Sequence, residues 1–526
     1  MQARPWLVDR YGRVVNQAPA ESSSVEAPAE AEAERRSAAS FSLVRRLLRG
    51  ERTSQVLTAI AALAPELSEP SHDSFERWRE IAPWTLAGLA REAIVQCRSA
   101  ATSPFDEGKF RTLLNAYSQS YDAHPNPGSA EARFTLLASH AYDQMPYQES
   151  DGQEISRTLS LFSDEIAINQ HRLSVIDAAT IEELVGGPLP EVLRATLLLA
   201  EVAKRERGVV SDRVWEEPWV ADFAGVVSRD VLREVVARMS ADVPTIRRAY
   251  QEELKNREVP RHVRRYAYNP LASTPLVRVD RRLIVPQPRL IRRRLGPNAL
   301  FYAGNAKYGG GFGTDLGYLA ETYVGRTLKQ IGGAQVFGEV EYRESGNSKK
   351  SIDWFLVTPN LVVLIESKAT RPDLRLRVGD PELGKALGDQ LKKSVKQLNT
   401  TNALISQGHT AFAHIPADRP RIGLTITAEP FYAGNHSDFR SLLPKPDLPI
   451  SFGSLRDLEA LAGYTAAILE DGLGRALTDP KWSSWSPLAA VKAATGVDPT
   501  LPTQVQGRVT DRLNLEPPPG SSRRSL

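Results

Sequence analysis

Two patterns of apolar and polar residues divide the chain. From Phe41 to about Val259, apolar residues recur at helical spacing and are interrupted by Pro, Gly, Asp and Ser, as in PEVLRATLLLAEVAKRE. Such a pattern is typical of amphipathic helices that pack against one another. It has no fixed repeat period, so a regular solenoid is not favoured. The sequence therefore predicts a mainly α-helical domain over residues 41–259, and its pattern does not indicate a role.

The pattern changes after Pro260. The runs TPLVRV and RLIVPQP predict two short strands around a turn, within a basic connector over residues 260–313. Residues 314–477 alternate between helical and strand patterns, and the last helix is expected over SLRDLEALAGYTAAILEDG. We expect residues 1–40, which are rich in Ala, Glu, Ser and Pro, to be flexible. Residues 478–526 are expected to form a C-terminal extension with a disordered end.

Composition narrows the class of protein. The 526 residues are too many for one compact core, since domains usually contain ~100–200 residues. The single cysteine, Cys97, excludes an internal disulfide framework, and no Cys/His cluster has the spacing of a structural zinc site. The chain has neither a signal-peptide pattern nor an apolar run of ~18 residues. We therefore expect a soluble, cytoplasmic protein with no membrane partner.

Basic residues concentrate in one part of a chain whose net charge is only +3. Between Lys255 and Arg294 the acidic residues are Glu258 and Asp280, and two tyrosines are interleaved with the arginines. This stretch could contact a phosphate backbone. It could equally be a solvated face that keeps the protein soluble, and the sequence leaves both readings open.

The candidate chemistry lies in SIDWFLVTPNLVVLIESKA, residues 351–369. Two β-rich runs flank a Pro359-Asn360 turn, which predicts a hairpin. With these two residues at the centre of the turn, Asp353 lies directly across from Glu366. Lys368 lies on the same face as Glu366, because side chains alternate along a strand. A shift of one residue in the turn would separate the two carboxylates, so the geometry depends on the register.

The surroundings of these carboxylates predict a metal. The hairpin is apolar on both faces and therefore belongs inside a covered sheet. Buried charges are costly unless they are paired or bound to a metal, and two close carboxylates also repel each other. A divalent cation removes both conflicts, and hard oxygen ligands suit Mg²⁺, with Mn²⁺ as a substitute. Asp353 and Glu366 are therefore candidate metal ligands.

Two predicted helices offer further groups. A helix over about 315–331 places Glu321 at the edge of its apolar face, where it could supply a third carboxylate ligand. A helix over about 381–401 places Gln390 and Gln397 on nearly the same edge of its apolar face. Either amide could bind a phosphate or a metal-bound water. The pattern does not choose between them, and Gln397 is taken as the catalytic candidate.

The ordered set of residues resembles the PD-(D/E)XK nuclease superfamily. The matching elements are the helical Glu321, the hairpin Asp353, the Glu366-Ser367-Lys368 motif and the glutamine of the following helix. RIGLTIT, residues 421–427, fits the next core strand. The sequence departs from the superfamily pattern at Ile352, where Pro is common. The similarity covers about residues 314–427 and does not include the helical region.

The resemblance implies an α/β restriction-endonuclease-like core, a mixed sheet flanked by helices, preceded by the mainly α-helical domain. It also implies that Asp353, Glu366 and Glu321 hold Mg²⁺ and that Lys368 and Gln397 act in catalysis. The implied activity is metal-dependent hydrolysis of phosphodiester bonds by a DNA endonuclease, of the kind found in bacterial restriction or phage-defence systems.

The resemblance also suggests partners. DNA is the expected substrate, restriction-like enzymes often act as homodimers, and the helical domain could bind a partner protein that restrains the nuclease. The alternative is a catalytically inactive nuclease-like fold that serves as a nucleic-acid-binding or assembly protein.

Overall fold

The structure is a computed structural model that describes the chain in several stretches. These are residues 41–67, 81–98, 104–118, 138–256, 266, 268–372, 388–432, 434–501 and 509–514. The segment 1–40 and the last residues of the C-terminal extension, for which flexibility and disorder are expected, lie outside these stretches. None of the described helices combines the length and apolar character that a membrane-spanning helix requires.

The N-terminal region consists mainly of helices, as the sequence predicts. Its helices include α2 (Thr53–Leu63), α4 (Pro83–Gln96), α5 (Glu107–Ser118), α7 (Asp151–Leu159), α8 (Glu165–Asn169), α9 (Ala178–Val185), α10 (Leu189–Arg205), α11 (Arg229–Met239) and α12 (Val243–Asn256). The amphipathic helix α10 buries one stripe, which includes Val192, Leu199 and Ala203. Asp177 and Ser228 begin α9 and α11 by accepting hydrogen bonds from backbone amides of the first turn.

A small sheet connects this helical region to the basic segment. It has four strands in the order β1-β4-β3-β2: β1 (Val209–Ser211), β2 (Ser240–Asp242), β3 (Leu276–Val279) and β4 (Arg282–Ile284). β3 and β4 are antiparallel around Asp280 and Arg281, whose φ angles of 47° and 60° suit a two-residue type I′ turn. The two strands predicted within residues 260–313 are thus confirmed. Their pairing with β1 and β2 could not be read from the sequence.

The C-terminal part contains a mixed five-stranded sheet in the order β11-β10-β9-β8-β5. Its strands are β5 (Gln335–Gly338), β8 (Trp354–Val357), β9 (Val362–Lys368), β10 (Arg421–Thr427) and β11 (Ile450–Ser454). β9, β10 and β11 run parallel, whereas β8 is antiparallel to both β9 and β5. A separate hairpin of β6 (Glu341–Glu344) and β7 (Asn347–Lys350) precedes β8. The predicted mixed α/β architecture is confirmed.

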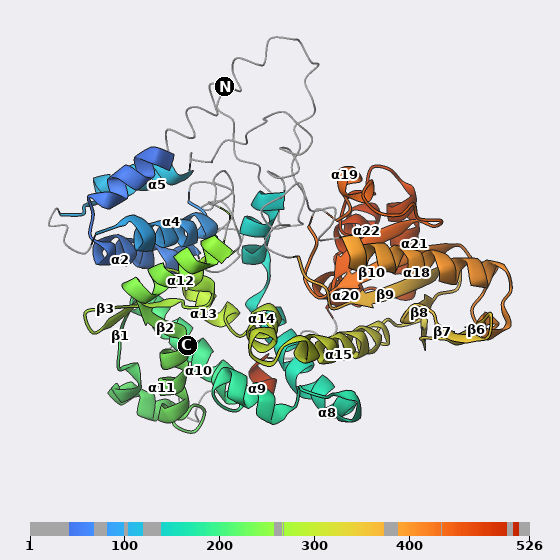
Figure 1. The fold of residues 1–526 in the computed structure, drawn as a ribbon, viewed down its shortest axis with the longest axis horizontal. Coiled ribbons are helices and arrows are strands. Elements are labelled where there is room, and N and C mark those ends of the chain that lie inside the picture. Colours follow the sequence, from blue (N-terminus) through green and yellow to red (C-terminus); the bar gives the residue numbers. More distant parts are fainter. Residues whose placement is uncertain are drawn as a thin grey trace, which may run out of the picture.

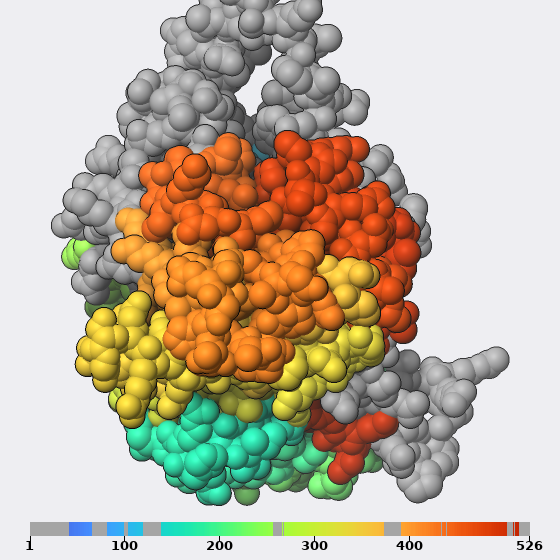
Figure 2. All heavy atoms as spheres, turned by 90° about the vertical axis from the view of Figure 1, so that its right-hand side faces the viewer, coloured from blue at the N-terminus to red at the C-terminus, as the bar shows by residue number. Residues whose placement is uncertain are grey.

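Helices cover both faces of this sheet. α15 (Gly310–Leu328) and α20 (Leu455–Leu461) lie on one face, and α18 (Gly388–Ser406) lies on the other. In β9, Val363 and Ile365 pack in a cluster with Leu319 of α15, whereas Val362 and Leu364 pack with Val395 of α18. Successive strand residues point to opposite faces, so a strand apolar on both faces needs both covers. The orange residues that include α18 occupy the middle of the face shown in Figure 2.

The remaining helices extend the fold beyond the sheet. They include α13 (Pro288–Arg293), α14 (Pro297–Tyr308), α19 (Ser437–Arg440), α21 (Ala466–Thr478), α22 (Pro487–Thr495) and α24 (Val509–Arg512). Val491 of α22 and Leu513, just after α24, are fully buried in the largest apolar cluster. Part of the expected C-terminal extension therefore packs against the body of the molecule.

Helix α15 lies between the helical region and the sheet. The largest apolar cluster runs without interruption from Leu161 and Leu199 of the helical region through Leu319 of α15 to Ile365 of β9. Figure 1 shows α15 extending from the helices of the N-terminal region toward β8 and β9. The position of α15, and of any group that it carries to the sheet, is consequently fixed from both sides.

Candidate active site

The register of the β8–β9 hairpin is the one that the turn predicts. Trp354 lies opposite Ile365 and Val357 lies opposite Val362. Continuing this register by one residue places Asp353, which immediately precedes β8, across from Glu366. The prediction that the hairpin brings the two carboxylates together is therefore confirmed.

The turn of the hairpin is held by a side chain from a distant helix. Glu470 of α21 accepts hydrogen bonds from the Thr358 hydroxyl at 2.8 Å and from the Asn360 amide nitrogen at 3.0 Å. It also accepts one from the Asn360 side chain at 2.5 Å. Because the turn length sets the register, these bonds help to keep Asp353 opposite Glu366.

Four of the predicted site residues meet at the end of β9. The Lys368 ammonium forms an ion pair with the Glu366 carboxylate and donates a hydrogen bond of 3.0 Å to Oε1 of Gln397 on α18. The backbone amide of Ser367 donates to Oδ2 of Asp353 at 2.6 Å. The structure thus brings Gln397 to the site. The side chain of Gln390, the other candidate amide, lies outside the described residues.

Burial opposes the ionisation of both carboxyl groups. Burial and the neighbouring Glu366 carboxylate raise the pKa of Asp353 to about 8, against the lowering effect of the Ser367 amide and Lys368. Burial likewise raises the pKa of Glu366, against the lowering effect of Lys368. The side chain of Glu366 is only 1% exposed, and its Oε2 has no hydrogen-bond partner among the described residues. An acceptor left in this state is costly.

These features fit a divalent cation. Asp353 and Glu366 offer hard oxygen atoms from two adjacent strands, and a cation between them would offset their repulsion and occupy the unpaired Glu366 oxygen. Ser367 and Lys368 already orient one oxygen of each carboxylate. The two carboxylates are therefore the residues that could hold Mg²⁺ or Mn²⁺.

Glu321 stands apart from this pair. It lies on α15, which covers the face of the sheet opposite to α18, and its carbonyl oxygen accepts a hydrogen bond of 3.0 Å from the Trp354 indole. Its charge is near enough to help raise the pKa of Asp353. Among the described residues, however, no three His, Cys, Asp or Glu side chains are grouped as metal ligands. The role of Glu321 as a third ligand stays a prediction.

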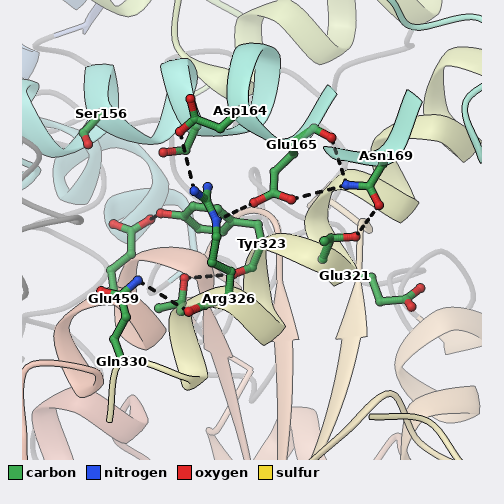
Figure 3. Close-up of polar contacts among 12 residues, drawn as sticks. Ser156, Asp164, Glu165, Asn169, Glu321, Tyr323, Arg326, Gln330 and Glu459 are labelled. Atoms are coloured by element: carbon green, nitrogen blue, oxygen red, sulfur yellow. Dashed lines mark hydrogen bonds and ion pairs between the residues drawn. The ribbon is translucent and has the colours of Figure 1, made fainter. Parts of the chain in front are cut away.

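Polar contacts with α20 and with the helical region hold α15 in place (Figure 3). Tyr323 donates to Glu459 of α20 at 2.8 Å, and Arg326 pairs with the fully buried Glu165 of α8 at 2.8 Å. The Thr322 hydroxyl donates to Asn169 at 3.0 Å. The Glu321 side chain points away from these contacts. The helix that carries Glu321 is thus tied down along the side that faces the helical region.

Sequence reasoning missed two hydroxyl groups near Glu366. Thr425 of β10 lies beside Glu366 in the parallel register, and its hydroxyl lies 2.6 Å from that of Ser394 on α18. Both side chains are fully buried. The available signal was the threonine at an otherwise apolar position of RIGLTIT. A polar side chain in a strand covered on both faces indicates a polar neighbour.

No protein-family model and no curated protein matches this chain. Functional assignment therefore depends on the side chains at the end of β9. They place two carboxylates, one ammonium and one amide within a single side-chain cluster.

Proposed function

We propose that this protein is a metal-dependent nuclease that hydrolyses phosphodiester bonds in DNA through a restriction-endonuclease-like core. The observation that carries the proposal is the placement of Asp353 opposite Glu366, with Lys368 and Gln397 beside them. The mixed sheet covered by α15 and α18 supports the choice of core. The resemblance of the ordered motif to the PD-(D/E)XK superfamily supports the choice of reaction.

Each residue has a role that its contacts support. Asp353 and Glu366 would hold Mg²⁺, which when bound supplies Lewis-acid activation of water and neutralises charge on the scissile phosphate. Lys368 contributes a positive charge where negative charge develops on the phosphate in the transition state. Gln397 orients the Lys368 ammonium through its 3.0 Å hydrogen bond, and the Ser367 amide orients Asp353. Lys368 thus stabilises the transition state by charge.

The test is cleavage of supercoiled plasmid by the full-length protein in Mg²⁺, in Mn²⁺ and in EDTA. We expect nicking with either metal, none in EDTA, and none by Asp353→Asn. Asp471→Asn is the matched control, because Asp471 is an exposed carboxylate on α21 that pairs, among the described residues, with Arg475. Nicking by Asp353→Asn at the rate of the wild type would reject the proposed site.

A second function has one observation in its favour. Because the described residues contain no group of three metal-ligating side chains, the same fold could bind nucleic acid without cutting it. That protein would show salt-dependent affinity for DNA and would release no product with Mg²⁺ or Mn²⁺. The plasmid assay, run beside a binding measurement, separates the two functions.

A further inference from the structure

The arginines of α13, which form the end of the basic segment, are engaged in contacts inside the molecule. Arg289 of α13 is 1% exposed, lies 3.2 Å from Asp151 of α7 and donates to the carbonyl of Tyr147. Arg292 pairs with the same Asp151 at 2.7 Å, and Arg294 donates to the carbonyl of Ser273 at 3.1 Å. The guanidinium groups of Arg289 and Arg292 link α13 to the helical region. The α13 part of the basic segment therefore offers little charge to a phosphate backbone, so a surface for DNA has to be sought elsewhere.

Helix α18 runs antiparallel to β9 and β10. Near its C-terminal end, Asn402 accepts a hydrogen bond from Arg421, the first residue of β10. One and a half turns earlier along the helix, Gln397 contacts Lys368 at the end of β9. The N-terminal half of α18 therefore lies at the same end of the sheet as the candidate active site.

One flank of α18 faces the site and the other faces away from it. Gln397 contacts Lys368, and Thr401 lies 3.3 Å from the amide nitrogen of Ile352. Asn399 contacts the loop before β11 on the opposite flank, where it donates to the carbonyl of Lys445. The direction of each side chain of α18 relative to the site can thus be assigned.

Two lysines lie on the solvent-facing side of α18, and Lys393 is the one next to the site flank. At 100° per residue, Lys393 lies about 40° from Gln397 around the helix, and Lys396 lies about 100° from it, both turned away from the buried side. Both are exposed, and neither forms an ion pair with any of the described residues. Figure 2 shows that the part of the chain containing α18 is open to view on this face. This exposed pair, Lys393 and Lys396, is called the α18 lysine pair below.

We propose that the α18 lysine pair binds the phosphate backbone of duplex DNA and so aligns the duplex with Asp353, Glu366 and Lys368. This inference rests on the proposed nuclease function, which identifies the bound polyanion as DNA. Its physical basis is charge complementarity beside the candidate site, since unpaired lysines release counterions from DNA when they contact phosphates. The arginines of α13 are then mainly structural.

The test measures the salt dependence of binding of a labelled duplex by fluorescence anisotropy. The proteins are the wild type, the double variant K393Q/K396Q and the control R281Q/R282Q, whose two arginines are exposed at the β3–β4 turn. Binding is measured in EDTA and, on the Asp353→Asn background, in Mg²⁺, so that no product forms. Thermal unfolding confirms that each variant is folded.

We expect the slope of log affinity against log salt to fall by about 1.8 in K393Q/K396Q, at about 0.9 per phosphate contact, and to be unchanged in R281Q/R282Q. An unchanged slope in the lysine variant overturns the inference, and so does a loss confined to the arginine variant or a wild type that does not bind duplex DNA. Cleavage is scored separately. Binding through the lysines without cleavage would overturn the nuclease function and leave this surface standing.

Discussion

The Asp353 side chain occupies surroundings that disfavour its charge. It is half-buried beside Glu366, and the loss of hydration and the neighbouring carboxylate raise its pKa to about 8. The Ser367 amide and the Lys368 ammonium oppose the shift without cancelling it. The ionised form of this carboxyl group is costly without a counter-charge, which is the physical reason for assigning it to a cation.

The raised pKa predicts a pH dependence of stability in the metal-free protein. An unfolded Asp has a pKa of about 3.9, so between about pH 4 and pH 8 the folded protein retains a proton that the unfolded chain has released. The free energy of unfolding should therefore fall as the pH rises through this window, and Asp353→Asn should remove much of the fall. Urea unfolding in EDTA at pH 5 and pH 8 measures this change in the free energy of unfolding. An equal pH dependence in Asp353→Asn would contradict the assigned surroundings.

Mg²⁺ should stabilise the folded protein more as the pH rises, because it binds the ionised form of Asp353. A ligand that binds only the folded state adds RT ln(1 + [L]/Kd) to stability. We expect Mg²⁺ to raise the melting temperature of the wild type more at pH 8 than at pH 5, because protonation of Asp353 competes with the cation. Differential scanning fluorimetry at both pH values measures this. Asp353→Asn serves as the comparison and should show little response.

The positions of some site residues could be predicted from the sequence, and those of others could not. Asp353 and Glu366 could be paired because a two-residue turn fixes every later pair in the hairpin. The choice of Gln397 depends on how α18 is rotated and shifted against β9, which helical periodicity alone does not define. The buried Ser394–Thr425 pair depends on the same packing.

At the scale of elements, the β8–β9 turn and α21 act together. Glu470 accepts three hydrogen bonds from Thr358 and Asn360. Glu470→Ala should lower the free energy of unfolding by about 1–3 kcal/mol, because it removes three hydrogen bonds to a charged acceptor. Asp471→Ala, at the next position on α21, removes only an exposed ion pair and should cost less than about 1 kcal/mol. Chemical denaturation of both variants tests this, and equal losses would argue against the turn contact.

One predicted element was wrong. The sequence predicts a single helix over SLRDLEALAGYTAAILEDG, but the structure has two, α20 (Leu455–Leu461) and α21 (Ala466–Thr478). Ser454 and Asp457 form a capping box that starts α20, and the Thr465 side chain caps α21. The apolar pattern continues through the break, which hides it. Gly463 and Thr465 were the local signals of a helix end followed by a new start.

Short strands were also difficult to predict. β1 and β2 each contain three residues within a helical region, so neither shows a period-two pattern of useful length. They form because β3 and β4 offer them partners. The predicted strand at 421–427 and the β8–β9 hairpin are longer and apolar, and their bounds could be read directly.

At the scale of the whole molecule, a buried ion pair joins the helical region to the sheet. Arg157 of α7 binds both carboxylate oxygens of Glu459 on α20, at 2.5 and 2.8 Å, and also pairs with Glu149 at 2.8 Å. Tyr323 of α15 donates to the same Glu459. Apolar periodicity predicts that these helices have a buried side, but it does not predict which helices pack together. The shared core therefore became visible only in the structure.

Breaking this pair should be costly. Arg157→Ala leaves the buried Glu459 carboxylate without its main partner, and such losses amount to about 3–5 kcal/mol. Arg475→Ala is the control, because its pair with Asp471 is more than half exposed and should contribute below about 1 kcal/mol. Equilibrium unfolding in urea, followed by circular dichroism, compares the two. Similar losses would contradict the role of Arg157 in joining the two regions.

The most direct test of the proposed nuclease site is the plasmid cleavage rate of Lys368→Ala compared with Lys349→Ala in Mg²⁺. Lys368 contacts Glu366 and Gln397, whereas Lys349 is an exposed lysine of β7 paired with Glu344. Removing a charge that stabilises the transition state should slow cleavage by about 100-fold or more in Lys368→Ala. Lys349→Ala should cut at the rate of the wild type. Cleavage by Lys368→Ala at the wild-type rate would contradict the proposed active site.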